Sequence, residues 1–140
     1  MKFWWSDQIH EVWAPYATCE GVGSGGDCYV TSLLTDDGGM GYETTITESE
    51  AVIAAMKEIR AGLIESYSWS RESFCADICR DSVKISSQYC EDYFDIMKFE
   101  EFEKTLNAWR ELLMAGPEGA LKEQIFTIHP TLCRPPQAEI

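Results

Sequence analysis

The chain has 140 residues, of which 45% are hydrophobic and 12% aromatic, and this composition is typical of one packed domain and excludes a disordered chain. Twenty-four acidic against eleven basic residues give a formal net charge of −13, which repels nucleic acid and anionic membranes. There is no apolar run of about 18 residues that could span a membrane, and the N-terminal sequence MKFWWSDQIH lacks the apolar segment of a secretory signal. We therefore expect a single cytoplasmic domain over residues 1–140, with a short proline-containing tail (130–140) and neither nucleic acid nor membrane as a partner.

The first half of the chain is expected to consist of strands joined by glycine turns. Residues 9–19 alternate loosely between apolar and polar, and residues 28–35 are rich in β-branched, aromatic and aliphatic side chains. Residues 42–47 place apolar and threonine side chains on one face of a third strand. The intervening DDGGMG (36–41) has the chemistry of a turn, since aspartates cap bends and glycines accept positive φ.

Two amphipathic helices are predicted. Thr47 to Glu50 fit the S/T-x-x-E capping box, and the apolar spacing that follows predicts a helix over about 48–64. A second apolar stripe predicts a helix over about 99–115, which Gly116 and Pro117 should end. The stripe of this second helix comprises Phe99, Phe102, Leu106, Trp109 and Leu113.

The remaining segments favour a sheet. Residues 82–89 and 93–97 are predicted to form a hairpin, and residues 124–129 a last strand, whereas 66–80 fit a strand or a short helix. The two predicted helices have apolar residues at matching positions when the sequence is shifted by 50 residues. This similarity indicates either two ββα units or a chance match between two amphipathic helices. The expected fold class is therefore α+β, with both helices packed on a largely antiparallel sheet.

The stretch GVGSGGDC (21–28) contains G-x-G-x-x-G, the spacing of a dinucleotide-binding loop. That loop requires a helix directly after it, because the helix N-terminus supplies amides to the pyrophosphate. Here a strand is predicted over 28–35, and carboxylates surround the glycines in the sequence. We therefore interpret the stretch as a long hairpin connection on an acidic face and expect no cofactor.

Catalytic and metal sites are weakly indicated. Cys28 could act as a nucleophile with His10 or His129 as its base, but neighbouring carboxylates disfavour the thiolate. The six cysteines include no C-x-x-C pair, so reduced, buried thiols are expected and a metal site is not. Adjacent carboxylates could supply an acid and a base, although turns and helix starts explain them equally. The prediction is a non-enzymatic protein, with a small cysteine- or carboxylate-dependent enzyme as one alternative.

The segment SVKISSQYCEDYFDIMKFEEFEKTLNAWRELL (82–113) resembles the strand–hairpin–helix portion of small bacterial immunity proteins, which are encoded beside polymorphic or contact-dependent toxins. The resemblance lies in the order of a polar strand, a short apolar strand, and a helix with phenylalanine at its start and tryptophan near its end. It implies a non-enzymatic, acidic inhibitor that neutralises a cationic toxin, often a nuclease, by tight binding.

Charge distribution supplies the candidate contact residues. Residues 1–56 contain one basic residue and nine carboxylates, and a second acidic stretch follows Cys90. A basic protein partner is the expected ligand, because opposite charge accelerates encounter. A phage-encoded inhibitor that mimics DNA and blocks a defence nuclease fits the charge as well, and a homodimer stays open. The residues expected to contact the partner lie near predicted turns and are Asp36, Asp37, Glu43, Glu91, Asp92 and Asp95.

Overall fold

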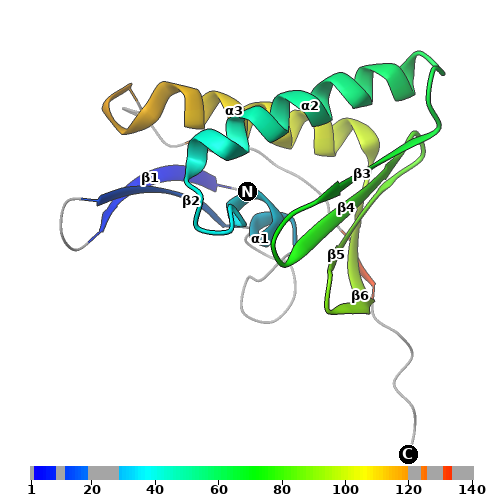
Figure 1. Cartoon of the computed structure of the whole chain (residues 1–140), viewed down its shortest axis with the longest axis horizontal. Coiled ribbons are helices and arrows are strands. Elements are labelled where there is room, and N and C mark those ends of the chain that lie inside the picture. The colour runs from blue at the N-terminus through cyan, green and yellow to red at the C-terminus, as the bar shows by residue number, and fades with distance from the viewer. Residues whose placement is uncertain (1, 9–11, 19–28, 120–123, 126–130, 134–140) are drawn as a thin grey trace, which may run out of the picture.

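The computed structural model describes residues 2–8, 12–18, 29–119, 124–125 and 131–133 (Figure 1). Its secondary structure confirms the α+β class. The elements are, in chain order, β1 (Lys2–Gln8), β2 (Val12–Thr18), α1 (Tyr29–Thr35), α2 (Tyr42–Arg60), β3 (Ser66–Ser70), β4 (Phe74–Cys79), β5 (Val83–Ser87), β6 (Cys90–Met97), α3 (Phe99–Gly119), β7 (Gln124–Ile125) and β8 (Thr131–Cys133).

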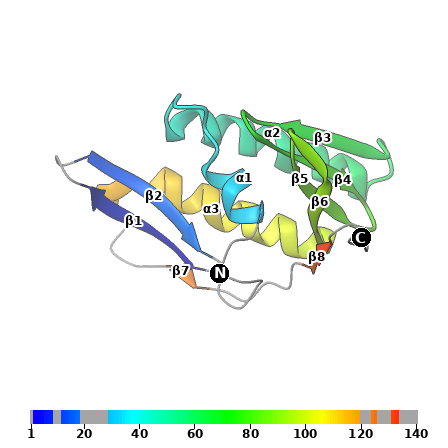
Figure 2. The ribbon, with the colours of Figure 1, turned by 90° about the horizontal axis from the view of Figure 1, so that it is seen from below.

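The strands form two antiparallel sheets. The larger sheet has the order β3-β4-β5-β6-β8, and the smaller has the order β2-β1-β7. Helices α2 and α3 pack side by side, with the β1–β2 hairpin against one part of α3 and β3 against α2 (Figures 1 and 2). The short α1 contacts β2 of one sheet and β4, β5 and β6 of the other, so it bridges the two sheets.

The core confirms the predicted stripe of the second helix. All five stripe residues of α3 are at most 1% exposed, and Trp109 packs edge-on against Phe3 of β1 with 4.8 Å between ring centroids. Each large apolar side chain buried in this way contributes about 1.5–3 kcal/mol. The backbone of α3 breaks at Gly116, whose φ is +69°, where the sequence predicted the helix to end. Buried side chains from both sheets and all three helices join one hydrophobic cluster.

Two predicted strands of the first half are wrong, because residues 29–35 and 42–60 are helical. In α1 the buried residues Val30, Leu33 and Leu34 fall at i, i+3 and i+4, which is one face of a helix. Tertiary burial of that face overrides the β propensity of the individual residues. The strands expected over 28–35 and 42–47 therefore do not form a ββα unit with the helix that follows, although β1, β2 and α1 follow one another in that order, as do β5, β6 and α3.

Helix α2 begins at Tyr42, six residues before the predicted start. Its buried face runs back through Thr45 and Ser49, which continue the stripe with small polar side chains. Thr47 lies inside the helix and its hydroxyl donates to the carbonyl of Glu43 at 3.4 Å, so the predicted capping box is not formed. The helix ends at Arg60, before the predicted end near residue 64, and Gly62 follows with φ +77°. Leu63, which falls inside the predicted helix, is therefore exposed.

The second half agrees with the predictions more closely. Strands β5 and β6 form the predicted hairpin, and the ambiguous segment 66–80 is the hairpin of β3 and β4. Part of the predicted C-terminal tail is a strand, because Thr131–Cys133 pair with β6. None of the described helices combines the length and the apolar character needed to cross a lipid bilayer.

Candidate interaction site around the 36–41 loop

The loop between α1 and α2 (residues 36–41) is a well-defined turn. Gly38, Gly39 and Gly41 all have positive φ, from +62° to +94°, which L-residues with a side chain rarely adopt. The carboxylate of Asp37 accepts from the amide of Gly39 at 2.9 Å, and the amide of Met40 donates to the carbonyl of Asp37 at 3.0 Å. Met40 is 73% exposed. The loop therefore holds a large apolar side chain in solvent beside a carboxylate.

Asp36 attaches this loop to the larger sheet. Its Oδ2 accepts from the backbone amides of Ser73 at 2.7 Å and Phe74 at 3.0 Å, in the turn between β3 and β4. A carboxylate that accepts hydrogen bonds from two backbone amides satisfies donors at a strand end that lack a partner in the sheet. Asp36 was predicted to contact a partner, but the structure gives its Oδ2 a role inside the fold.

A hollow of about 360 Å³ lies between the loop, α2 and the β3–β4 turn. We call it the acidic hollow, because four carboxylates and one guanidinium line it. Its ionisable residues are Asp36, Asp37, Glu48, Glu72 and Arg71. Glu72 is exposed in the β3–β4 turn. It was not among the predicted contact residues, because the sequence fitted either a strand or a short helix over residues 66–80 and so predicted no turn there.

The guanidinium of Arg71 is engaged inside the protein. Its side chain is 1% exposed, donates to the carbonyls of Leu33 and Leu34 at 3.0 Å each, and forms an ion pair with Glu48 at 3.3 Å. It also donates to Thr45 Oγ1 at 2.6 Å. Burial lowers the pKa of Arg71 below its usual value, while the nearby Glu48 and Asp36 carboxylates act in the opposite direction. Arg71 thus caps the C-terminal end of α1, where a cation is favoured by the helix dipole.

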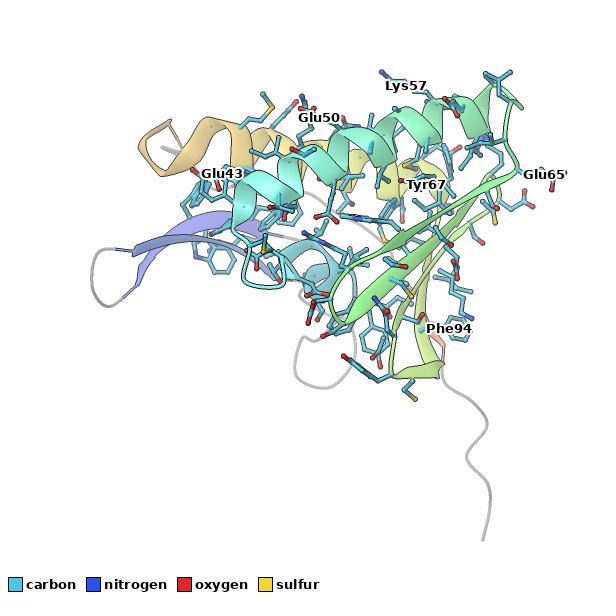
Figure 3. The ribbon with its side chains drawn as sticks, viewed as in Figure 1. Glu43, Glu50, Lys57, Glu65, Tyr67 and Phe94 are labelled. Carbon is cyan, nitrogen blue, oxygen red and sulfur yellow. The ribbon has the colours of Figure 1, made fainter. Side chains whose placement is uncertain are left out.

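Glu43 remains a surface candidate. It is exposed in the first turn of α2, two residues after the loop (Figure 3). Asp37 and Glu72 line the acidic hollow together with Met40, whereas Glu43 follows Met40 by three residues and does not line the hollow. Glu91 and Asp92 belong to β6, and their side chains lie outside the described part of the chain.

Asp95 is the clearest correction among the predicted contact residues. It is 0% exposed on the inner face of β6, opposite Ile85, and its Oδ2 accepts from the amide of Tyr29 at 2.6 Å. Its Oδ1 has no hydrogen-bond partner among the described residues. Burial raises the pKa of Asp95, against the lowering effect of the amides at the start of α1. It caps the N-terminal end of α1 and cannot meet a partner at the surface.

The glycine-rich stretch 21–28 lies outside the described residues, as do His10, Cys28 and His129. The segment that follows it is helix α1, so the strand on which its interpretation depended is wrong. A different observation argues against phosphate binding at the start of α1. The first amide of the helix, at Tyr29, already donates to the Asp95 carboxylate and is not available to a phosphate, and the helix has only seven residues.

The cysteines also differ from expectation. Cys75, Cys79 and Cys90 are free thiols, of which Cys79 and Cys90 are exposed where buried thiols were predicted. Cys75 and Cys79 lie on strand β4 and so point to the same face of the sheet. Within the described residues, no group of three or more histidine, cysteine or carboxylate side chains is arranged to hold a metal ion.

Comparisons with protein-family models, with curated proteins and with solved structures gave no match.

Proposed function

We propose that this chain is an acidic protein-binding inhibitor whose contact surface is centred on the 36–41 loop and the acidic hollow. The observation that carries the proposal is Met40, which is 73% exposed on a turn held by its own hydrogen bonds; Asp37 and Glu72 line the same hollow, and the exposed Glu43 begins the helix that follows. Protein interfaces combine a desolvated apolar anchor with a polar rim. A preorganised loop of this kind binds with little loss of conformational entropy.

The charge of the chain favours a basic partner. The formal net charge is −13, and the one guanidinium in the acidic hollow is engaged by backbone carbonyls, Thr45 and Glu48. The carboxylates of Asp37, Glu43 and Glu72 are thus left to attract lysine and arginine side chains of another protein. Such complementarity raises the association rate and helps to select the partner.

The particular form of this activity that we propose is that of an immunity protein. It would bind a cognate basic toxin in the cytoplasm and occlude the active site of that toxin. The resemblance of residues 82–113 to bacterial immunity proteins and the acidic surface both support this form. The protein itself would carry out no reaction.

Co-expression with the product of the adjacent gene tests the proposal. We expect growth to be rescued from the toxicity of that product, and the two chains to co-purify. The association rate of the purified pair should fall steeply as salt is raised, because the steering is electrostatic. Rescue without a physical complex, or an association rate that does not depend on salt, would contradict the proposed mechanism.

A further inference from the structure

Strand β3 is one edge of the larger sheet, whose strand order is β3-β4-β5-β6-β8 (Figure 1). Among the residues that the structure describes, no strand pairs with its other side. The amide of Arg71, directly after β3, donates to the carbonyl of Phe74 at 2.8 Å, so these two residues continue the β3–β4 register as a hydrogen-bonded pair. Because hydrogen-bonded and non-hydrogen-bonded pairs alternate along an antiparallel ladder, the backbone amides and carbonyls of Ser66, Ser68 and Ser70 point away from β4. We call these outward backbone groups the free edge.

The free edge lacks the features by which proteins usually prevent an edge strand from pairing with another chain. Those features are short length, proline, bulges and charged side chains. Among the other described edge strands, β7 and β8 have two and three residues, and β2 contains Pro15. Strand β3 has five residues, SYSWS, with neither a charge nor a proline, and its register with β4 is unbroken. Its three serine side chains are exposed and too small to obstruct an approaching strand.

Side chains on both faces of β3 hold the free edge in place. On the inner face, Trp69 is buried and its indole N–H donates to Glu48 at 3.2 Å, while the half-buried Tyr67 packs against the core (Figure 3). On the outer face, the hydroxyl of Ser68 donates to the carboxylate of Asp77 on β4 at 2.7 Å. A strand that pairs with β3 therefore meets backbone groups that are already ordered, which lowers the entropic cost of binding.

Charge decides which kind of strand fits. The exposed carboxylates of Asp77, beside Ser68, and of Glu72, directly after Arg71, lie near the free edge. A second copy of this chain would bring a further formal charge of −13 to the edge, whereas a strand that carries lysine or arginine is attracted to it. Ser70 and Glu72 also line the acidic hollow, so the free edge continues the contact surface proposed above.

We infer that the free edge of β3 binds an extended segment of the basic protein partner, which joins the larger sheet as its next strand. The backbone of that segment pairs with Ser66, Ser68 and Ser70. Its side chains alternate between apolar residues, which cover the half-buried Tyr67, and basic residues on the side of Asp77. In strand addition of this kind the main-chain hydrogen bonds supply affinity and the alternating side chains supply specificity. The inference rests on the proposed function, because it assigns to the partner the segment that pairs with β3.

The test uses the whole protein and the synthetic peptide acetyl-Lys-Val-Lys-Val-Lys-Val-Lys-amide, so that it does not depend on the identity of the partner. Amide hydrogen exchange of ¹⁵N-labelled protein is followed by NMR with and without saturating peptide. Exchange at Ser66, Ser68 and Ser70 should slow about tenfold or more, because their amides become hydrogen-bonded. Exchange at Tyr67 and Trp69, whose amides already face β4, should change little. Unchanged exchange at the three serines would overturn the inference.

Two control peptides separate strand pairing from simple charge attraction. The analogue that is N-methylated at every residue has no amide donors, and the analogue with glutamate in place of lysine carries the opposite charge. Neither should slow exchange at the three serines, and equal slowing by either one would overturn the inference. Slowing that occurs without peptide and grows with protein concentration would show that a second copy occupies the free edge, and would overturn the assignment to a basic strand.

Variants at Ser68 test the edge from the side of the protein. Ser68→Pro removes an outward amide that does not belong to the β3–β4 ladder, a position at which an edge strand tolerates proline, and should weaken peptide binding about tenfold or more. Ser68→Ala is the matched control, because it removes only the hydroxyl bond to Asp77 and should bind like wild type. Ser68→Lys keeps the amide and places a cation at the edge, so it should also weaken binding and serves if the proline variant does not fold. Circular dichroism establishes which variants are folded, and wild-type affinity in a folded Ser68→Pro or Ser68→Lys variant would overturn the inference.

Failure of this inference is distinguishable from failure of the proposed function. If the adjacent gene product is bound and neutralised equally by wild type and a folded Ser68→Pro variant, strand addition at β3 is wrong although the inhibitor function stands. If the peptide pairs with β3 as expected but the adjacent gene product is neither bound nor neutralised, the proposed function is wrong and the strand-binding edge stands.

Discussion

The 36–41 loop and strand β6 both carry carboxylates next to predicted turns, and the fold uses them in opposite ways. In the loop, Asp37 and the exposed Met40 are held at the surface by hydrogen bonds within the turn. On β6, Asp95 is fully buried and accepts from the first amide of α1. Similar acidic residues in the sequence therefore divide into surface residues and internal caps according to the face on which the backbone places them.

Helix α1 lies between these two regions and explains the difference. It has seven residues, which is too short to be stable alone. Asp95 supplies a negative group at its N-terminus and Arg71 a positive group at its C-terminus, as the helix dipole favours. Asp37 in the loop that follows α1 is not needed to hold the helix, because Asp95 and Arg71 supply the charges at its two ends.

The largest effect is expected from Arg71→Met. This change leaves the carbonyls of Leu33 and Leu34, the Thr45 hydroxyl and the Glu48 carboxylate without their shared donor. Breaking a buried ion pair from one side costs about 3–5 kcal/mol in the free energy of unfolding. Urea denaturation measures it, with Arg80→Met as the matched control, because the ion pair of Arg80 with Glu100 is exposed. Equal destabilisation by the two variants would show that Arg71 does not hold α1.

Asp95→Ala should destabilise the protein next most strongly. It removes the acceptor for the Tyr29 amide from a fully buried position, and the loss of a helix cap costs about 0.5–2 kcal/mol. Hydrogen exchange should show the loss concentrated in α1. Exchange in α1 that matches the wild type while the protein as a whole unfolds more easily would refute the capping role.

Asp36→Ala removes the carboxylate that accepts from Ser73 and Phe74. A cost of about 1–2 kcal/mol is expected, because two backbone amides lose a charged acceptor. Asp37→Ala, one residue away, breaks only the local bond to Gly39 and should cost less. Thermal denaturation of the two variants measures the difference in stability. A larger loss of stability for Asp37→Ala than for Asp36→Ala would contradict the role given to Asp36.

The pH dependence of stability sharpens the view of Asp95. Burial raises its pKa above the usual 3.8, so the native state binds this proton more tightly than the unfolded chain. The resulting contribution to stability is fully present below pH 3.8 and is lost as pH rises through the folded pKa. The unfolding free energy of wild type relative to Asp95→Asn should therefore increase as pH falls from 7 towards 4. An opposite trend would mean that the amides of α1 outweigh the burial.

The smallest effect on stability, and the clearest on binding, is expected from Glu43→Lys combined with Glu72→Lys. Both side chains are exposed, so the free energy of unfolding should hardly change. The association rate with the basic toxin should fall about tenfold at low salt, and the difference should shrink as salt is raised. The control is Glu58→Lys with Glu65→Lys. It makes the same change in net charge on exposed residues at and beyond the other end of α2. If the control slows association equally, net charge acts without a defined site.

The sequence by itself determined those elements whose apolar residues follow a clear period. The stripe of α3 predicted that helix and its buried face, and residues 82–89 and 93–97 were predicted as the hairpin that β5 and β6 form. The loop 36–41 was also predicted, since aspartate and glycine specify a turn through local chemistry. Local signals of this kind do not depend on what the rest of the chain does.

The tertiary structure decided the features that depend on a neighbour. Thr45 and Ser49 are buried only because α2 packs on the core, so the helix extends further back than its apolar residues indicate. The seven residues of α1 are too few for a stable helix alone, and Asp95 and Arg71 from other elements bond to its two ends. The role of Asp95 could not be predicted because an isolated carboxylate prefers water, and only an amide delivered from another element makes its burial tolerable.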